Sequence, residues 1–570
     1  MPIRTGFKTH WLIPYTGVAM PDISGIFNIG RRALSAHQAA IAVTSHNIAN
    51  VNTPGYSRQE ALYGTTPPLS GSFGTGVQIA QVRSVVDTFL QRQIISEQST
   101  LGRFGVEKGL LDRVEAIFSS TDGGIHQAIS NFFDAVNDLS NNPSGIAERN
   151  ALLLSGGTLS QTIRTADSQL KSISQDVNSE IAGRVDEINL LAGKIADLNK
   201  QIRLVENSGE GNTANDLRDD RVRLLGELSE KIGTHLLEEE GGDITVTVGS
   251  GGAAVALVSG EHAHSLSTVA DEDNSGFSKI LSSGGTDITH AIADGRLRGL
   301  IELRDNLLPT YTDRLDKLAA SIVFEWNAQH KKGFDLAGNA GGDFFSPLKS
   351  VLGSVDETNT GTAQVVVTAA PLPDNTPPGS TFDSYELSFS DGKFTIKNLD
   401  TGASTTDLSV PFEGLDIVIT GEAAEGDRFQ ITVDRAGSYK GLAETIDVAL
   451  SDPALIAAAP SADEVPGGNG NAILLAQLQD KQVFSLNSTF QGFFADFTGE
   501  VGARAKLSQQ NLSVEEVLSQ KLDTMREEVS GVSLDEETTN LISFQRAYQA
   551  AAKLVTTADE LLQTVIEMKR

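Results

Sequence analysis

Few residue pairs in this sequence have the spacing that metal binding or catalysis requires. His262 and His264 lie two residues apart in the segment GEHAH, so on a strand both side chains would share one face and could bind a metal ion. Exposed histidines without a metal are the more common interpretation of such a pair. Asp335–Asp343 has acidic ends and glycines like a calcium loop, but it lacks the alternating ligands and the closing Glu of an EF-hand. We therefore predict no metal site, and we interpret Asp335–Asp343 as a turn-rich loop.

Longer catalytic motifs are also missing from the sequence. It contains no H-E-x-x-H helix, no G-x-x-x-x-G-K-[ST] phosphate loop and no G-x-S-x-G nucleophile turn. The glycine-rich run GSGGAAVALVSG is not followed by an obvious helix, so it does not fit a dinucleotide-binding plan. The absence of cysteine excludes thiol catalysis, disulfides and Cys-ligated zinc. We predict no catalytic residue and no cofactor, which makes an enzyme the weakest functional class.

The charge balance argues against two kinds of partner. The 570 residues carry a formal net charge of −30, and the pI is near 4.6. A nucleic-acid binder needs a basic surface to neutralise phosphates, and an anionic membrane surface attracts basic segments. No apolar run reaches the roughly 20 residues that span a bilayer. We therefore predict no nucleic acid and no membrane as partners. The length suggests about three to five domains.

The C-terminal end of the chain shows the clearest helical pattern. From Leu541 onward, apolar or small residues recur at alternating intervals of three and four, which is typical of a coiled-coil helix. Ser533 is placed to cap this helix, and the acidic residues that follow it favour the first turn. The predicted C-terminal seam consists of Leu541, Phe544, Tyr548, Ala551, Val555, Ala558, Leu562 and Val565.

The N-terminal segment carries a thinner stripe with the same period. A single helix with so narrow a stripe is marginally stable in water. We therefore expect the two terminal helices to pair as a coiled coil; the alternative is that each packs on the middle of the chain. The predicted N-terminal seam consists of Ile23, Phe27, Leu34, Ile41 and Ile48, and the small or polar positions between them are Gly30, His37 and Thr44.

Between the two ends the pattern is helical, then β-rich, then helical again. A long helix is expected within 150–206, and alternating segments between 364 and 433 predict strands with a hairpin turn at Ser390–Gly392. The predicted fold class is multidomain and mainly α with β-rich insertions: paired terminal helices, a helical second layer and outer β domains. The predicted divisions are an extension outside the fold (1–19, with translation expected to start at Met20), a terminal coiled-coil domain (20–60 and 530–570), a long-helix domain (61–235 and 465–529), a mixed α/β segment (236–345), a β-rich outer insertion (346–445) and a connecting segment (446–464).

Polar and turn-forming residues follow the N-terminal helix in the segment NIANVNTPGY. Thr53-Pro54-Gly55-Tyr56 suits a tight turn, because Pro fixes φ at the second position and Gly accepts a positive φ at the third. Asn50 or Asn52 could end the helix in the left-handed conformation. We expect this segment to redirect the chain outward. Tyr56 is then either packed against a neighbouring subunit or buried within its own.

The same segment resembles the N-terminal signature of the bacterial flagellar rod, hook and hook-associated proteins. The residues of this assembly motif are Asn47, Ala49, Asn50, Asn52, Thr53, Pro54, Gly55 and Tyr56. SFQRAYQAAAKLVTTADELLQTVI resembles the paired C-terminal end of the family, and SGVSLDEETTNLISFQ, NAQHKKGFDLAGNAGGDFF and NDLRDDRVRLL are similar to stretches of its hook-associated members. The resemblance covers both ends and the helical middle, but not the β-rich insertion or residues 1–19.

This resemblance implies a structural subunit at the junction between hook and filament, outside the cell. It implies export through the flagellar type III route without a cleaved Sec signal. The implied partners are further copies of the chain in a ring, the hook protein, the next hook-associated protein toward the filament, the export apparatus and an export chaperone. Two alternatives stay open: another axial subunit, such as a hook or distal rod protein, and a surface adhesin that uses the acidic insertion.

Overall fold

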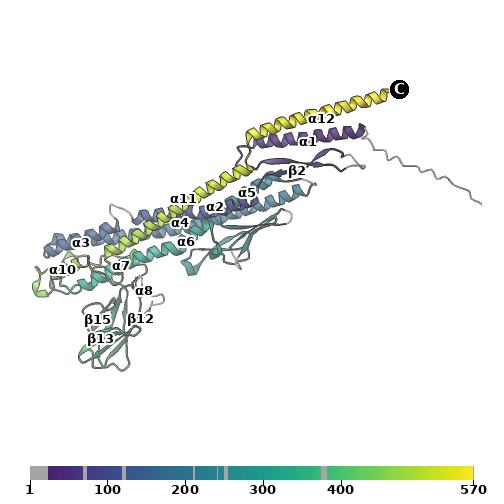
Figure 1. Ribbon diagram of the computed structural model, residues 1–570. Coiled ribbons are helices and arrows are strands. Elements are labelled where there is room, and N and C mark those ends of the chain that lie inside the picture. Colours follow the sequence, from purple (N-terminus) through teal and green to yellow (C-terminus); the bar gives the residue numbers. More distant parts are fainter. Residues whose placement is uncertain are drawn as a thin grey trace, which may run out of the picture.

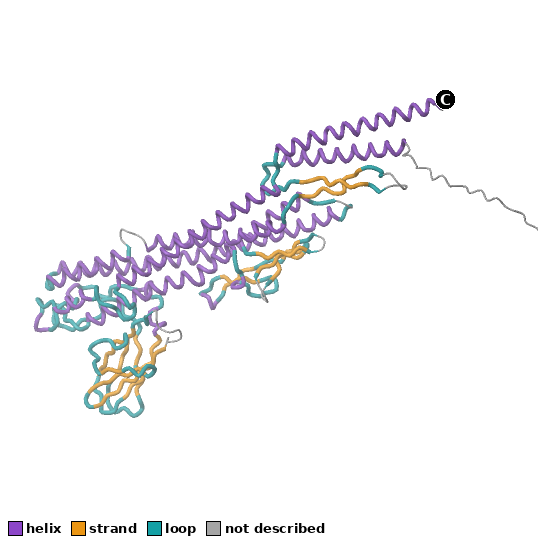
Figure 2. The backbone as a smooth tube through the Cα atoms, in the orientation of Figure 1, coloured by secondary structure: helices purple, strands orange, loops and turns teal. Residues whose placement is uncertain are grey.

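Long helices run along the length of the protein, and β-sheets are attached beside them (Figures 1 and 2). The computed structural model describes residues 23–67, 74–118, 124–209, 212–239, 242–249, 254–373 and 382–568. The predicted extension, residues 1–19, lies outside this described part. The predicted fold class, multidomain and mainly α with β-rich insertions, is confirmed, and the two terminal helices lie side by side at one end.

The helices fall into a terminal pair and a bundle. The terminal pair is α1 (Ile23–Ala49) and α12 (Leu534–Met568). The bundle contains α2 (Thr88–Phe118), α3 (Ile125–Asn141), α4 (Ile146–Glu206), α5 (Asn215–Lys231), α6 (Gly295–Glu302), α7 (Leu308–His330), α10 (Gly470–Gln477) and α11 (Phe490–Ser530), with the short α8 (Arg435–Tyr439) and α9 (Leu442–Thr445) beside it. A π-helical turn, Leu303–Leu307, joins α6 to α7.

The strands of the described part form five sheets. A hairpin pairs β1 (Gln59–Thr65) with β2 (Val77–Ser84). A four-stranded sheet holds β3 (Thr234–Glu238), β4 (Ile244–Val248), β5 (Val255–Ser259) and β6 (His262–Ala263), and a ribbon pairs β7 (Ser267–Ala270) with β8 (Ser278–Leu281). The outer domain contains β9 (Ser350–Leu352), β10 (Ser354–Val355), β11 (Gln364–Ala369), β12 (Phe382–Ser390), β13 (Lys393–Asn398), β14 (Ser404–Thr405), β15 (Leu415–Thr420) and β16 (Arg428–Asp434).

The 61-residue helix α4 forms the core of the bundle. Ile181, Ile188 and Ile195 recur every seven residues and are fully buried, as the sequence pattern predicted. Each such side chain stabilises the fold by about 1.5–3 kcal/mol. Arg184 breaks the apolar rhythm because the next residue, Val185, takes the buried position.

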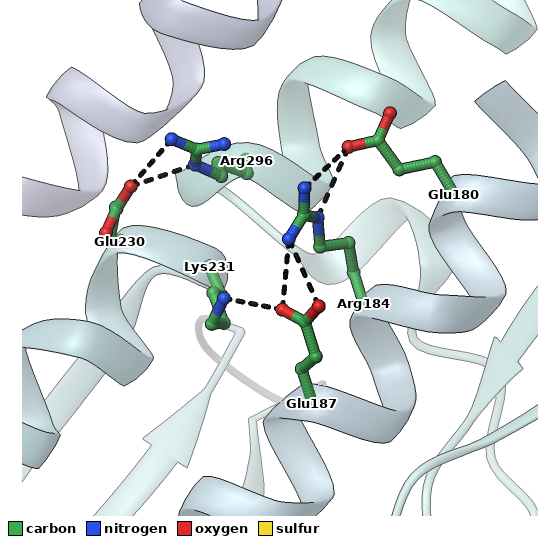
Figure 3. A network of polar contacts seen from close by, with 6 residues as sticks. All are labelled: Glu180, Arg184, Glu187, Glu230, Lys231 and Arg296. Atoms are coloured by element: carbon green, nitrogen blue, oxygen red, sulfur yellow. Dashed lines mark hydrogen bonds and ion pairs between the residues drawn. The ribbon is translucent and has the colours of Figure 1, made fainter.

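Arg184 instead joins a surface network between helices (Figure 3). It pairs with Glu180 at 2.9 Å and with Glu187 at 3.0 Å, both on α4. Lys231 at the end of α5 reaches Glu187 at 2.5 Å, so the network ties α4 to α5. These side chains are partly exposed, so each pair contributes at most about 1 kcal/mol.

The outer β domain is a sandwich with its own core. A sheet in the order β10-β16-β12-β13-β14 packs on a sheet in the order β15-β11-β9, and Val365, Leu387 and Phe429 lie in the shared core. The predicted hairpin turn is confirmed: Ser390 pairs with Lys393, and Asp391 and Gly392 have φ of 51° and 74°. Two positive φ values are required by the type I′ turn that joins twisted antiparallel strands.

The segment 446–464 is more than the predicted connection, because it is packed into the bundle. Ile456 and Ala457 are fully buried. The buried Arg149 guanidinium donates to the carbonyl of Ile456 at 2.7 Å. His330 Nδ1 lies 2.7 Å from the Gly342 carbonyl, and its Nε2 accepts from the Ala457 N–H at 2.9 Å. These two bonds require the neutral imidazole with its proton on Nδ1.

Burial lowers the pKa of His330 to about 4, so the bundle should lose stability in acid. The unfolded chain binds the His330 proton below about pH 6.5, whereas the folded chain does not until about pH 4. We expect the stability advantage of wild type over His330→Gln to fall by roughly 1.4 kcal/mol per pH unit within this window. Urea unfolding followed by Trp326 fluorescence at neutral pH and near pH 5 measures it.

The matched control is His262→Gln, because His262 is exposed on β6. The same pH series on this variant measures the effect of replacing an exposed histidine by glutamine. A His330→Gln difference that is constant across the window would contradict the neutral-imidazole assignment.

Candidate assembly site

The two ends of the chain meet as an antiparallel helix pair. Gly30 of α1 lies against Val555 of α12, whereas Arg58, just after α1, pairs with Glu536 at the start of α12 at 2.9 Å. A Cβ on Gly30 would lie 2.7 Å from Val555 Cγ2, which is closer than side chains approach. The absence of a side chain at Gly30 therefore sets how closely the two helices approach each other.

The predicted N-terminal seam needs correction, because other residues of α1 are the buried ones. Phe27 is 38% exposed, and Leu34, Ile41 and Ile48 are only partly buried; the side chain of Ile23 lies outside the described part. The buried residues of α1 are Gly30, Ala36, Ala40, Thr44 and Asn47. The reason is that α1 lies between α12 and the β1–β2 hairpin, so small residues fill the contacts and larger ones lie at the edges.

The predicted C-terminal seam is buried along only part of α12. Ala551 and Ala558 are buried, and Leu541, Phe544 and Val555 are partly buried, whereas Tyr548 is exposed at its edge. Leu562 and Val565 are exposed, at 37% and 51%. The physical reason is length: Gly30 lies opposite Val555, so the described part of α1, which begins at Ile23, reaches only to about Leu562.

The turn after α1 has the predicted geometry. The Tyr56 N–H donates to the Thr53 carbonyl at 3.2 Å, and Gly55 has a φ of 86°. The expectation that Asn50 or Asn52 ends the helix in the left-handed conformation is wrong, since neither has a positive φ. The Asn50 side chain instead donates to the His46 carbonyl at 3.0 Å, so an amide rather than a left-handed residue satisfies the helix end.

Asn47 holds the end of α1 and the start of β1 together. It is fully buried, and its Oδ1 accepts from the Tyr56 hydroxyl at 2.8 Å and from the Gln59 N–H at 3.0 Å. Its Nδ2 donates to the Gln59 carbonyl at 2.9 Å. Burial, followed by the carboxylates of Asp216 and Asp219, raises the pKa of Tyr56, so the phenol keeps the proton that it donates. Within one subunit, Tyr56 is thus packed against its own chain.

The same segment attaches the terminal pair to the bundle through α5. The Ser57 N–H donates to Asp219 Oδ2 at 2.7 Å, and Gln59 Nε2 donates to Asp216 Oδ1 at 2.7 Å. Burial raises the pKa of Asp219 to about 6 despite the hydrogen bond from Ser57. We call residues 47–59, the first half of α5 and the α11–α12 connection the joint.

The third part of the joint is the connection between α11 and α12. The Arg58 N–H donates to the Ser530 carbonyl at 2.8 Å. Ser533 accepts from the Glu537 N–H at 2.9 Å through its carbonyl, which starts α12 where the sequence predicted. A groove of about 750 Å³ opens between the turn at 50–56 and the segment 523–536. The exposed residues Asn52, Thr53 and Pro54 line it.

The histidines and carboxylates that could bind a metal ion do not form a metal site in the described part. His262 is exposed, and no group of three or more potential metal ligands converges among the described residues. Asp335 uses its carboxylate locally, accepting from the N–H groups of Ala337 and Asn339 at 2.8 Å each. Asn339 Nδ2 also donates to it, so Asp335–Asp343 is a turn held by its own side chains. None of the described helices is long and apolar enough to cross a membrane.

Comparison with known proteins links both the ends and the middle to flagellar proteins. Residues 111–345 match the family described as the flagellar hook-associated protein FlgK helical domain. Residues 27–56 match the flagella basal body rod protein family, and residues 526–568 match the C-terminal family of the flagellar basal body rod FlgEFG proteins. The last two matches coincide with α1 plus its turn and with α12.

Individual relatives cover nearly the whole chain. Flagellar hook-associated protein 1 of Escherichia coli strain K12 is 27% identical over 96% of this chain and 100% of its own. The protein of the same name from Bacillus subtilis strain 168 is 26% identical over 94% of this chain and 96% of its own. Along nearly its whole length the chain is thus similar to flagellar hook-associated protein 1. It is a structural protein of the bacterial flagellum.

A solved structure shares the fold. The flagellar hook junction protein FlgK from Burkholderia pseudomallei superposes with a TM-score of 0.56 at 20% identity, covering 77% of this chain and 100% of that one. At this level of identity the likeness concerns the fold alone.

Sequence reasoning missed the hairpin beside the joint and the contacts of the joint with α5. The β1–β2 hairpin was not predicted, and the division between 60 and 61 falls inside β1. Asp216 and Asp219 were noticed only as part of a segment resembling the family, NDLRDDRVRLL. Their contact with Ser57 and Gln59 spans about 160 positions of sequence, so no local pattern could reveal it.

Asn47→Ala should loosen the joint. The substitution removes the Asn47 hydrogen bonds to both backbone groups of Gln59 and to the partly buried Tyr56 hydroxyl, which keeps only its contact with His46 Nδ1 at 3.1 Å. This loss costs about 1–3 kcal/mol. We expect faster amide hydrogen exchange in β1, with α4 unchanged. Asn52→Ala is the control, because Asn52 is exposed. Equal protection of β1 in wild type and Asn47→Ala would refute the role given to Asn47.

Gly30→Leu should separate the terminal helices. Its side chain would occupy the space of Val555 and Leu554, and overpacking of this kind costs about 1–3 kcal/mol. We expect faster amide exchange along α12 between Leu541 and Ala558. Ser35→Leu adds the same side chain on the exposed face of α1 and should have no such effect. Identical exchange in the two variants would show that the close approach does not depend on Gly30.

Proposed function

We propose that this protein forms the junction between the hook and the filament of the flagellum, and that its paired terminal helices are the part that assembles. The observation that carries this proposal is an exposed apolar surface at the free end of the terminal pair. Leu562, Val565 and Ile566 are exposed at the end of α12, beyond the described part of α1. Apolar residues gathered on one helix end favour association. We call residues 561–568 the α12 overhang.

The charge distribution also supports self-association through the terminal helices. Together, the 62 residues of α1 and α12 contain four Arg or Lys and six Asp or Glu residues, a net charge of −2, and are thus somewhat less acidic for their length than the 570-residue chain, which carries −30. Copies of a strongly acidic chain repel one another. Neighbouring subunits can therefore approach most closely through their terminal helices, with the acidic bundle and outer domain placed further apart.

The proposed partners follow from this arrangement. Further copies of the chain meet in a ring through the terminal pairs, the hook protein lies on one side and the next hook-associated protein lies toward the filament. Export through the flagellar type III route, with an export chaperone, precedes assembly outside the cell. Association then removes the exposed apolar side chains of the α12 overhang from water, which favours assembly.

Of the alternatives, an adhesive outer domain has one observation in its favour. Leu352 and Val410 are among the exposed apolar residues of the acidic sandwich within 346–445. This role is compatible with a junction subunit, because the sandwich stands away from the terminal pair (Figure 1). A hook or distal rod subunit is the weaker alternative, since the match at 111–345 is to a hook-associated family.

Deletion of the gene tests the junction role. We expect cells with bare hooks that release flagellin into the medium, because filament subunits would lack the surface on which they polymerise. Electron microscopy of the cell surface and flagellin measurement in the medium read this out. Absent hooks would move the protein to the hook or rod, and normal motile filaments would exclude a junction role.

Leu562→Asp tests the α12 overhang specifically. The residue is exposed in the single subunit, so the monomer should keep its helix content and thermal stability. Incorporation into flagella should be lost, because a charge would have to be buried between subunits. Gln563→Asp adds the same charge at the next, polar position and should still assemble. Normal incorporation of Leu562→Asp would show that the overhang is not an interface.

A further inference from the structure

One edge of the outer sandwich differs from the other edges of its two sheets. In the described part, the five-stranded sheet ends in β10 and β14, of two residues each, and the three-stranded sheet ends on one side in the three-residue β9. The remaining edge is β15, which pairs with β11 over all six of its residues (Figure 1). Short edge strands offer few backbone groups to another chain, so β15 is the edge of this domain best suited to accept a further strand.

The ladder with β11 shows which backbone groups of β15 point away from the sheet. The Ala370 N–H donates to the Gly414 carbonyl at 2.8 Å, so Gly414 faces β11. In an antiparallel pair the N–H and C=O of one residue point to the same side, and successive residues alternate. The register continues without a bulge to the end of β15. The even-numbered residues therefore face β11, whereas Ile417 and Ile419 face outward.

The outward-facing backbone groups of these two residues are unpaired. Within the described chain, neither Ile417 nor Ile419 makes a backbone hydrogen bond on this side of β15. The preceding turn covers only the first residue of the strand, since Phe412 and Leu415 exchange hydrogen bonds of 3.1 and 2.9 Å. Two N–H donors and two carbonyl acceptors at strand spacing match the backbone of another extended chain.

β15 also lacks most of the features that protect an edge strand from pairing. Its sequence, LDIVIT, contains no Pro and no Lys, and its one charged residue, Asp416, is partly buried. Ile417 and Ile419 pack against the sandwich core, but both side chains stay partly exposed, and β15 is the last strand on this side. A further strand would bury more of both side chains, which favours binding.

The charge of the outer domain determines what kind of chain suits this edge. Residues 351–440 contain 14 acidic and 5 basic residues, a net charge of −9. Glu422 and Glu425, just beyond β15, are exposed. A second copy would bring a domain of the same charge to the edge, and the two domains would repel each other. A positively charged segment of another polypeptide is attracted instead.

We propose that the free edge of β15 binds an extended, positively charged polypeptide segment of another protein. The segment adds a fourth strand to the sheet β15-β11-β9 and exchanges backbone hydrogen bonds with Ile417 and Ile419. Its apolar and basic residues alternate, so that the apolar side chains cover Ile417 and Ile419 on the core side and the basic ones lie on the opposite face with Asp416. Backbone pairing supplies the affinity, and the alternation supplies the specificity.

A synthetic peptide, Lys-Val-Lys-Ile-Lys-Val-Lys, tests this proposal on the full chain. We expect saturable binding of one labelled peptide per chain, measured by fluorescence anisotropy. Amide exchange resolved to single residues should slow at Ile417 and Ile419, whose N–H groups become bonded, and not at Val418, whose N–H already faces β11. Absence of saturable binding, or protection of Val418 alone, would overturn the proposal.

A modified peptide separates backbone pairing from simple charge attraction. The same sequence with N-methyl groups on its Val and Ile residues keeps every charge but loses the donors that face β15 when the apolar residues lie on the core side. We expect it to bind several-fold more weakly than the unmodified peptide. Equal affinity of the two peptides would show that no strand is added and would overturn the proposal.

Val418→Lys locates the site on β15. The Val418 side chain is 46% exposed, so the sandwich should fold, and a lysine there should weaken binding of the basic peptide several-fold. Leu352→Lys is the matched control, because it adds the same charge at a 72% exposed position on β9, the opposite edge of the same sheet. It should bind as wild type does. Unchanged affinity of Val418→Lys, or equal weakening in both variants, would exclude β15 as the binding edge.

A second copy of the chain is the other possible occupant of this edge, and amide exchange without peptide tests it. We expect exchange at Ile417 and Ile419 to be independent of protein concentration, because the acidic outer domains repel each other. Protection of these two residues that increases with protein concentration would show that β15 pairs with another copy, and would overturn the assignment to a basic partner.

Discussion

The close approach of the two chain ends is the contact on which the rest of the structure depends. α1 and α12 are separated by nearly the whole sequence, yet Gly30 brings the two backbones close at Val555. Because α1 and α12 pack together, the chain between them must lead away from this pair and then come back to it. The β1–β2 hairpin starts the outward path, and α11 completes the return beside α2. Each further layer is therefore an insertion within the previous one.

The joint connects the terminal helix pair to the bundle through polar contacts rather than through a shared apolar core. Asn47 fixes the turn to the start of β1, and the Ser57 and Gln59 contacts with α5 fix β1 to the bundle. Hydrogen bonds of this kind are directional, so they define an angle between the layers more sharply than apolar packing does. Two buried donors of this region, Arg58 Nε in the joint and Arg221 Nε on α5, have no hydrogen-bond partner among the described residues.

The layers also differ in how they are stabilised and in what they offer to neighbours. The bundle buries continuous rows such as Ile181, Ile188 and Ile195, and the outer sandwich closes its own core around Leu387 and Phe429. The terminal pair buries mostly small residues and leaves Leu562 and Val565 exposed. A subunit built this way keeps stable inner domains while its ends retain apolar surface, which suits the proposed assembly through the terminal pair.

The sequence alone determined the features that depend on local periodicity and on turn chemistry. The long α4, the strands of the outer domain, the Ser390–Gly392 turn and the start of α12 at Ser533 all follow from residues within one or two turns of each other. The heptad rhythm also predicted that the terminal helices pair, and the NIANVNTPGY segment indicated the family.

Only the tertiary structure decided which face of each helix makes the contact. The apolar stripe Phe27, Leu34, Ile41 and Ile48 suggested one seam, but α1 packs against two elements and buries Gly30, Ala40 and Thr44 instead. Heptad reasoning assumes a single partner helix, so it could not include the hairpin. The overhang of Leu562, the contacts of Asp216 and Asp219 and the burial of Arg221 likewise depend on where distant segments end and meet. Local sequence carries no information on these distances, because they are set by packing across the whole chain.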